Sequence, residues 1–167
     1  MNSQLDRLEA QARTREENGS HLARRLAAMP GVHPQARPAA CTRHAYHLFM
    51  LRLDEEAFGL PRELVLRALE AEGIPCSPGY GYSLTDQPLF RNKAFGPYLD
   101  HESRRADYGA MRCPNSDRIC RQAIWLEHNL LLGLRADADD IADAFEKIQS
   151  HRTALRGVLA QSTGAAG

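Results

Sequence analysis

The residues from Cys113 to Ile148, CPNSDRICRQAIWLEHNLLLGLRADADDIADAFEKI, predict a helix, a strand and a second helix in close succession. The polar segment 114–121 begins with a proline, which is favoured in the first turn of a helix. The short apolar run of Ile124, Trp125 and Leu126 predicts a strand. From Asp137 to about Leu159, apolar residues at helical spacing predict an amphipathic helix: Ile141, Phe145, Ile148, Leu155 and Leu159.

The stretch from Glu70 to Phe90, EAEGIPCSPGYGYSLTDQPLF, follows a predicted strand and helix. HAYHLFMLRL, residues 44–53, is apolar on both faces and predicts a central strand. Pro61 is expected as the first residue of the next helix and Gly73 as its C-terminal cap. Residues 74–78 form a candidate short strand. Residues 79–107 have little periodicity, and a loop of this length is expected to be functional or to rest on another surface.

An N-terminal helix is predicted over residues 4–29, and Pro30 and Gly31 stop it. Its middle is polar, and Gly19 lowers its helix propensity. One interpretation is a surface helix packed on its own domain. The other, which we favour because long marginal helices need tertiary contacts, is a linking helix with part of its apolar face against a missing partner. The apolar stripe consists of Leu5, Leu8, Ala12, Leu22, Leu26 and Met29.

Together these elements predict an α/β fold of the α+β-like kind, in which helices cover a small sheet of three to four strands. We expect residues 1–30 to form a connecting helix and residues 31–160 a small domain. Residues 33–42, which contain Pro34 and Pro38, are expected to be an irregular or edge segment. The tail at 161–167 is expected to be disordered.

Composition narrows the function classes. Lys+Arg and Asp+Glu balance at 21 each, so no overall field favours nucleic acid or an anionic membrane. No stretch approaches the roughly 20 apolar residues that span a bilayer, and the N-terminus does not resemble a signal peptide, so a cytoplasmic location is expected. The spacings of the four cysteines and seven histidines match no zinc motif, and the cysteines are expected to be buried or half-buried thiols.

In order and spacing, these pieces resemble the C-terminal small domain of the DegT/StrS-type sugar aminotransferases, which are pyridoxal-phosphate (PLP) enzymes of fold type I. The resemblance covers about Leu5 to Ile148. The sequence motifs are most similar to those of the branch that aminates inososes and related cyclitol or sugar ketones in aminoglycoside pathways. The resemblance implies amino transfer from an amino acid, glutamate or glutamine, to a keto-sugar or keto-cyclitol. The matching pieces are Arg15, Asn18, Leu22 and Leu26 in the first helix, the AEGI turn, the CP-started helix, the WL…LLG strand and the DDI…A..KI closing helix.

PLP chemistry needs a Schiff-base lysine, a carboxylate beside the pyridine nitrogen and donors for the phosphate. The resemblance implies that all of these lie in a large domain N-terminal to the connecting helix. Lys93 and Lys147 are the two lysines of the chain, and neither has the expected sequence context. The glycines near Tyr80 have no helix behind them that would make a phosphate cradle. We therefore assign no catalytic or PLP-binding residue here, and expect a PLP-binding large domain, in the same gene or a separate chain, as partner.

The resemblance also implies that the loop after the AEGIP turn approaches the substrate. Where family members often place a histidine, this sequence has Leu84 and Thr85. We nominate four residues as substrate-wall candidates: Tyr80, Tyr82, Thr85 and Phe90. The alternative for the aromatic members is ordinary packing within the loop.

Two functions remain open at this point. One is a domain of an aminotransferase that is inactive alone. The other is a non-catalytic, stand-alone dimerisation or interaction module derived from the same family, with a homodimer as one form. An independent small enzyme is not supported, because the sequence has no nucleophile elbow and no recognisable pair of catalytic carboxylates.

Overall fold

The computed structural model describes residues 2–98 and 106–157. A four-stranded antiparallel sheet has the order β1-β2-β4-β3. Its strands are β1 (Val32–Pro34), β2 (Leu48–Leu53), β3 (Cys76–Ser77) and β4 (Ala123–Glu127). The sheet and its helices confirm the predicted mixed α/β class. Among the described residues, no helix is long and apolar enough to cross a membrane.

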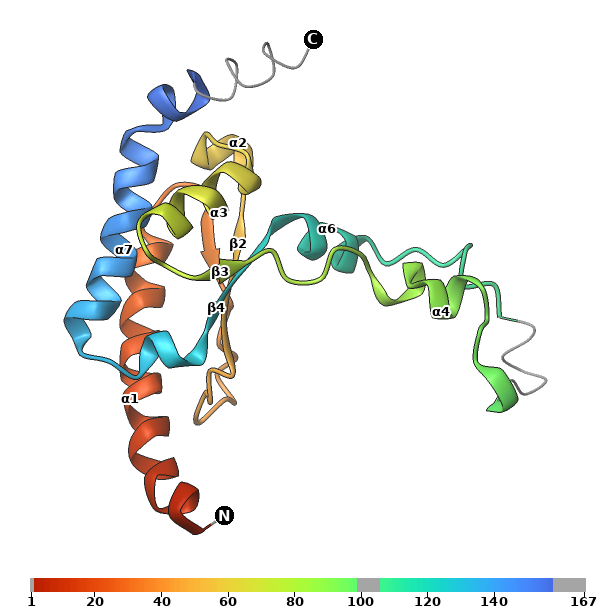
Figure 1. Cartoon of the computed structure of the whole chain (residues 1–167), viewed down its shortest axis with the longest axis horizontal. Helices are drawn as coiled ribbons and strands as arrows, with labels where there is room; N and C mark the ends of the chain where they lie inside the picture. The colour runs from red at the N-terminus through yellow and green to blue at the C-terminus, as the bar shows by residue number, and fades with distance from the viewer. Residues whose placement is uncertain (1, 99–105, 158–167) are drawn as a thin grey trace.

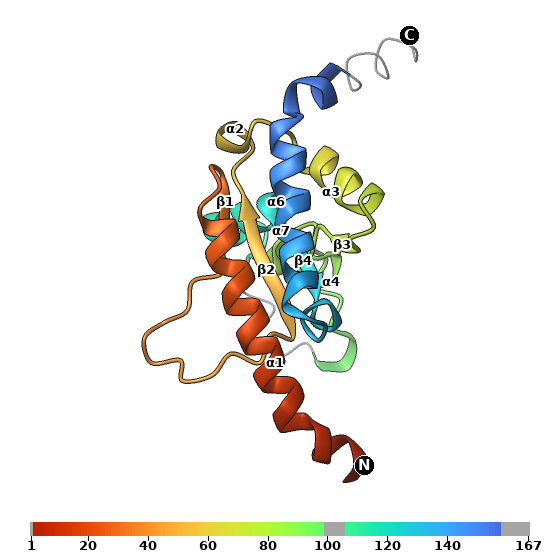
Figure 2. The ribbon, with the colours of Figure 1, turned by 90° about the vertical axis from the view of Figure 1, so that its left-hand side faces the viewer.

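One face of the sheet is covered by α1 (Asn2–Ala27) and α7 (Arg135–Ser150), which lie side by side in Figure 2. The third helix of the body, α3 (Arg62–Ala71), packs against α7. Every second residue of β2 is buried toward these helices, as strand geometry requires. The core joins the two layers through Phe49, Leu51, Leu53, Ile124, Leu126, Leu22, Leu26, Ile141 and Phe145. Burial of these side chains is the main favourable contribution to folding.

The N-terminal part of the predicted central strand is wrong, since β2 begins only at Leu48. The chain turns at Tyr46, which has a positive φ of 46° and whose amide donates to Nδ1 of His44. The Tyr46 ring lies against Gly19 of α1, where a Cβ atom would stand 2.7 Å from the ring. Gly19, which weakens the helix by propensity, therefore provides the space in which this ring packs.

The first helix is confirmed, and its apolar stripe is buried in one part and exposed in the other. Leu22 and Leu26 are fully buried in the core of this chain. Leu5 is 61% exposed and Leu8 is 53% exposed, in the turns that project beyond the body in Figure 1. The C-terminal half of α1 thus packs on its own domain, while Leu5 and Leu8 in its first turns remain exposed.

The connections differ in detail from the predictions. A short helix that was not predicted, α2 (Glu55–Phe58), begins after Asp54, whose carboxylate accepts from the amide of Ala57. Pro61 precedes the first residue of α3 and does not belong to the helix. Gly73 has a φ of 83° and ends this helix as expected. The last helix ends at Ser150, a second helical turn follows at 152–157, and the tail at 161–167 lies outside the described residues.

The described parts of the predicted long loop, residues 79–98 and 106–113, form an arm that projects from the body (Figure 1). It contains short helical turns: η1 (Leu84–Asp86), α4 (Pro88–Arg91) and η2 (Gly96–Tyr98). The chain returns to the body through α6 (Pro114–Gln122), which leads directly into β4. At the root of the arm, Gly79 has a φ of 70° and lies on the ring of Trp125, where a Cβ atom would come within 2.6 Å.

Candidate functional site

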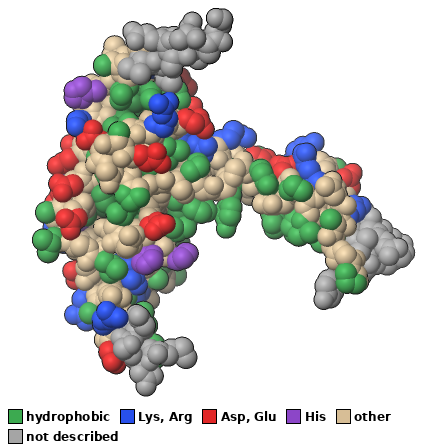
Figure 3. All heavy atoms as spheres, in the orientation of Figure 1, with side chains coloured by type: hydrophobic (Ala, Val, Ile, Leu, Met, Phe, Trp, Pro, Cys, Tyr) green, Lys and Arg blue, Asp and Glu red, His purple; other side chains and the backbone are tan. Residues whose placement is uncertain are grey.

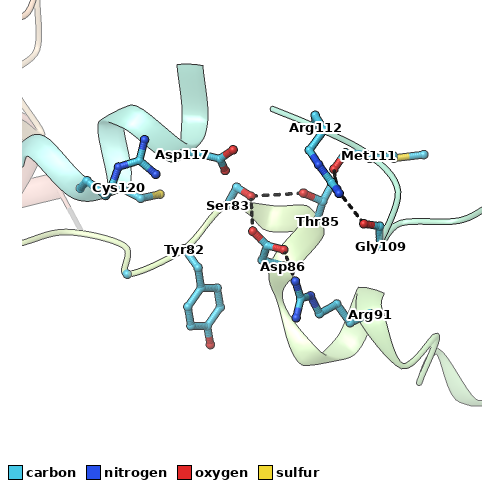
Figure 4. A pocket seen from close by; sticks show the side chains of 12 residues that line it. Tyr82, Ser83, Thr85, Asp86, Arg91, Gly109, Met111, Arg112, Asp117 and Cys120 are labelled. Carbon is cyan, nitrogen blue, oxygen red and sulfur yellow. Dashed lines mark hydrogen bonds and ion pairs between the residues drawn. The ribbon is translucent and has the colours of Figure 1, made fainter. Parts of the chain in front are cut away.

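A polar cavity of about 380 Å³ lies in the arm, between the segment that contains η1 and the helix α6 (Figure 4). Its size lies at the lower end of the range of small-molecule pockets. The two sides come from parts of the sequence about 30 residues apart, and the extension of the arm brings them together. Its lining includes the side chains of Tyr82, Ser83, Thr85, Asp86, Arg112, Asp117 and Arg121.

Asp86 is held in place by two donors. The hydroxyl of Ser83, a residue only 4% exposed, lies 3.1 Å from Oδ2 of Asp86 and 3.2 Å from Oγ1 of Thr85. The guanidinium of Arg91 donates to Oδ1 of Asp86 over 2.9 Å. A carboxylate has about four lone-pair sites, so Asp86 keeps acceptor capacity for a further group.

The opposite side of the cavity is formed by α6 and the segment before it. Asp117 lies in the first turn of α6, where the helix dipole favours a negative charge. Its side chain is half-buried, and within residues 2–98 and 106–157 its carboxylate forms no hydrogen bond or ion pair. Arg112 donates to the backbone carbonyls of Gly109 and Met111 over 2.8 and 3.0 Å, which fixes its guanidinium at the edge of the cavity.

Of the four nominated substrate-wall residues, two line this cavity. Thr85 contributes its hydroxyl, while Tyr82 lies at the rim with its ring directed away from Ser83 and Asp117 (Figure 4). Tyr80 packs edge-on against Trp125, with ring centroids 5.1 Å apart, and shares a neighbouring groove with Tyr82. Phe90 lines neither the polar cavity nor this groove.

Phe90 belongs to an aromatic cluster of the arm. Its ring centroid is 5.4 Å from those of Phe95 and Tyr108, and those two are 6.0 Å apart. These edge-to-face contacts are ordinary aromatic packing within the loop, which was the alternative to a role in the substrate wall. The sequence reasoning missed Ser83, Asp86, Asp117 and Arg112. The spacing of Ser83 and Asp86, a polar pair three residues apart at the start of a turn, was the available signal.

The lysines do not fit a PLP site. Nζ of Lys147 donates to Oε2 of Glu72 over 2.8 Å, and its side chain is 59% exposed on the surface of α7. Lys93 lies in the turn after α4 with a positive φ of 50°. Neither residue lines the cavity of the arm. The described residues therefore do not form a pocket in which a lysine amine and a carboxylate converge on a cofactor ring.

Similar proteins point to one family. The sequence profile of the DegT/DnrJ/EryC1/StrS aminotransferase family matches residues 1–146. An L-glutamine:2-deoxy-scyllo-inosose aminotransferase of Streptoalloteichus tenebrarius is 34% identical over 163 residues, which cover 92% of this chain and 37% of that protein. A 3-amino-5-hydroxybenzoate synthase of Amycolatopsis mediterranei is 33% identical over 148 residues, covering 86% of this chain and 36% of the relative.

Solved structures agree with this result. The crystal structure of 3-amino-5-hydroxybenzoic acid synthase has a TM-score of 0.63 and 28% identity, and the match covers 87% of this chain and 37% of that one. The structure of DesI in the presence of its TDP-sugar product has a TM-score of 0.65 at 19% identity, over 95% of this chain and 36% of that one, which shows the common fold. This chain spans a little over a third of the length of these relatives. It belongs to the DegT/DnrJ/EryC1/StrS aminotransferase family, as the resemblance in its sequence implied.

Proposed function

We propose that this chain is the C-terminal domain of a PLP-dependent aminotransferase that acts on keto-cyclitols or keto-sugars with an amino-acid donor, and that it is inactive alone. The names of the relatives support this substrate class, because they include several inosose aminotransferases. The share of those relatives that the chain covers supports a partial domain.

The observation that carries the proposal is the position of the two lysines. Transamination requires a lysine that forms a Schiff base with the cofactor. Lys147 is ion-paired with Glu72 on an outer helix, and Lys93 lies in a turn of the arm. The cofactor is thus proposed to be held by a PLP-binding large domain, and we derive no step through PLP in this chain.

The exposed apolar surface suits such a partner. Leu5 and Leu8 continue the buried stripe of α1 beyond the body. Hydrophobic side chains also gather along the arm and where it joins the body (Figure 3), among them Tyr80, Tyr82, Leu84 and Ile119. Contiguous exposed apolar surface marks interaction sites. In this arrangement residues 1–30 connect the domains, residues 31–160 form the small domain, and the arm contributes Tyr80, Tyr82 and Thr85 to the substrate wall. A cytoplasmic location is part of this proposal.

A chimera tests the function. The N-terminal part of the S. tenebrarius relative that this chain does not match is fused upstream of residue 2, and amination of 2-deoxy-scyllo-inosose by L-glutamine is measured. The N-terminal part alone and this chain alone are the controls. We expect amination by the chimera and by neither control.

Amination by this chain alone would contradict the proposal. A chimera that binds PLP without transferring an amino group, together with a stable dimer of the chain alone, would favour the stand-alone dimerisation module.

A further inference from the structure

We propose that the cavity of the arm binds a polyhydroxylated ring, and that Asp86 and Asp117 accept hydrogen bonds from its hydroxyls. This inference rests on the proposed function and deepens it, since it identifies where this chain would hold the substrate ring and by which groups. The positions of these two carboxylates in the cavity carry the argument.

The chemical character of the lining favours a polyol. Carboxylates only accept hydrogen bonds, guanidinium groups only donate them, and a hydroxyl can do both. The cavity combines Asp86 and Asp117 with Arg112 and the hydroxyl of Thr85. A ring that carries hydroxyls on neighbouring carbons can donate to the carboxylates and accept from the guanidinium at the same time.

Asp86 is oriented in advance for this role. Ser83 and Arg91 hold its two oxygens over 3.1 and 2.9 Å, so the carboxylate is already fixed before a ligand arrives. Preorganised acceptors reduce the entropic cost of binding, because fewer side-chain torsions must be fixed in the complex.

Asp117 has acceptor sites that no described residue uses. A half-buried carboxylate loses part of its hydration, and a hydrogen-bonding ligand compensates for that loss. Asp117 faces the cavity from the first turn of α6, opposite the Ser83–Asp86 pair (Figure 4). Ring hydroxyls that bridge the cavity would contact both carboxylates.

The lining also carries positive charge. Arg91 is paired with Asp86, and Arg112 is bonded to two backbone carbonyls. Arg121 lines the cavity as well and could donate to an anion, whereas the charge of Asp117 would repel one. A ring with several hydroxyls can use the carboxylates and the guanidinium groups together, so phosphate is titrated as the competing ligand.

Titration of the full chain with myo-inositol, followed by ¹H–¹⁵N NMR, tests the inference. We expect saturable shifts of the amides of 83–86 and 115–121. Asp117→Asn keeps the shape of the side chain and removes its charge, and it should weaken binding about tenfold, which corresponds to the loss of one charged hydrogen bond. Asp140→Asn, an exposed change on α7, is the matched control and should leave the affinity unchanged.

Inorganic phosphate is titrated in parallel. The inference is overturned if myo-inositol shifts no amide of the arm, if Asp117→Asn binds it as well as the wild type does, or if phosphate shifts the same amides at lower concentration. The circular dichroism spectrum of each variant shows whether the fold is retained, and Thr85→Val provides a second, uncharged change in the cavity. Because myo-inositol has no keto group, binding is independent of amino transfer. An inactive chimera would not contradict binding of myo-inositol by the cavity. Absence of binding would not contradict the aminotransferase proposal.

Discussion

The side-chain amide of Asn18, in the middle of α1, donates to the backbone carbonyl of Leu131 over 3.1 Å. The same amide donates to the carbonyl of Gly133 over 3.0 Å. Asn18 is buried, so this polar residue ties the long helix to the turn η3 (His128–Leu131) that leads from β4 to α7. A buried donor that satisfies two backbone acceptors explains why a polar residue occupies the covered face of α1.

Replacement of Asn18 by leucine should destabilise the chain. The change keeps the branched shape of the side chain and leaves both carbonyls without their donor, which costs about 1–3 kcal/mol. Urea denaturation followed by circular dichroism measures the loss. Asn129→Ala, at an exposed position of the same turn, should change the free energy of unfolding by less than about 0.5 kcal/mol. Equal stabilities of the Asn18 and Asn129 variants would show that the two hydrogen bonds of Asn18 do not stabilise the fold.

Two glycines with similar backbone angles should differ in their tolerance of alanine. Gly31 (φ 79°) and Gly73 (φ 83°) both adopt the left-handed conformation, which costs an alanine about 1–2 kcal/mol. A Cβ atom on Gly31 would stand 2.4 Å from the backbone nitrogen of Phe58, whereas one on Gly73 would meet nothing within 4 Å.

Gly31→Ala should therefore lower the free energy of unfolding by about 1–3 kcal/mol more than Gly73→Ala does, because the backbone must move. Thermal unfolding of the two variants side by side measures the difference. A Gly73 variant as unstable as the Gly31 variant would show that close packing at the α1–β1 turn is not the deciding factor.

Acid should weaken the contact between α1 and α7. Hydrogen bonds from His21, 2.7 Å away, and from Arg25, 3.0 Å away, lower the pKa of Asp139 below its ordinary value. A carboxylate with a lowered pKa in the folded state stabilises the fold above its unfolded-state pKa of about 4, and this contribution is lost as the pH falls through the lower folded-state value.

The wild type should thus exceed Asp139→Asn in stability at pH 7, and the gap should close as the pH is lowered from 5 toward 2. Denaturation curves at several pH values measure this, with Asp140→Asn as the control. A gap that persists at the acid end would mean that the carboxylate charge is not what stabilises the contact.

Cys76 should be the least reactive of the four cysteines. Burial, with a smaller contribution from the charge of Glu70, raises the pKa of its thiol to about 11. At pH 8 only about one thousandth of such a thiol is the reactive thiolate. Alkylation by iodoacetamide, followed by peptide mass spectrometry, should modify Cys41, Cys113 and Cys120 before Cys76. Modification of Cys76 at the same rate would contradict the partial burial of its thiol against α3.

Much of the body could be predicted from local sequence patterns. The apolar periodicity of α1 and α7, the proline at the start of α6 and the glycine after α3 all correspond to observed elements. The late start of β2 at Leu48 could not be predicted, because it depends on Tyr46 packing against Gly19 in a distant helix. Local patterns do not report such contacts.

The arm and its cavity were harder to predict, because the cavity is formed by residues that are distant in the sequence. Tyr82 and Thr85 were nominated from the resemblance, but their partners Asp117 and Arg112 follow about 30 residues later. The aspartates near the start of α7 also depend on distant contacts. Asp137 accepts from the amide of Leu134 at the helix start, whereas Asp139 and Asp143 pair with Arg25 of α1.

We propose that this chain carries the substrate-facing domain of an aminotransferase and not its cofactor site. Titration of the purified chain with PLP, followed by borohydride reduction and peptide mapping, tests it most directly. We predict no saturable absorbance band of a protein-bound aldimine and no stoichiometric adduct on either lysine. A one-to-one adduct fixed at Lys93 or Lys147 would contradict the account, because this chain would then hold the cofactor itself.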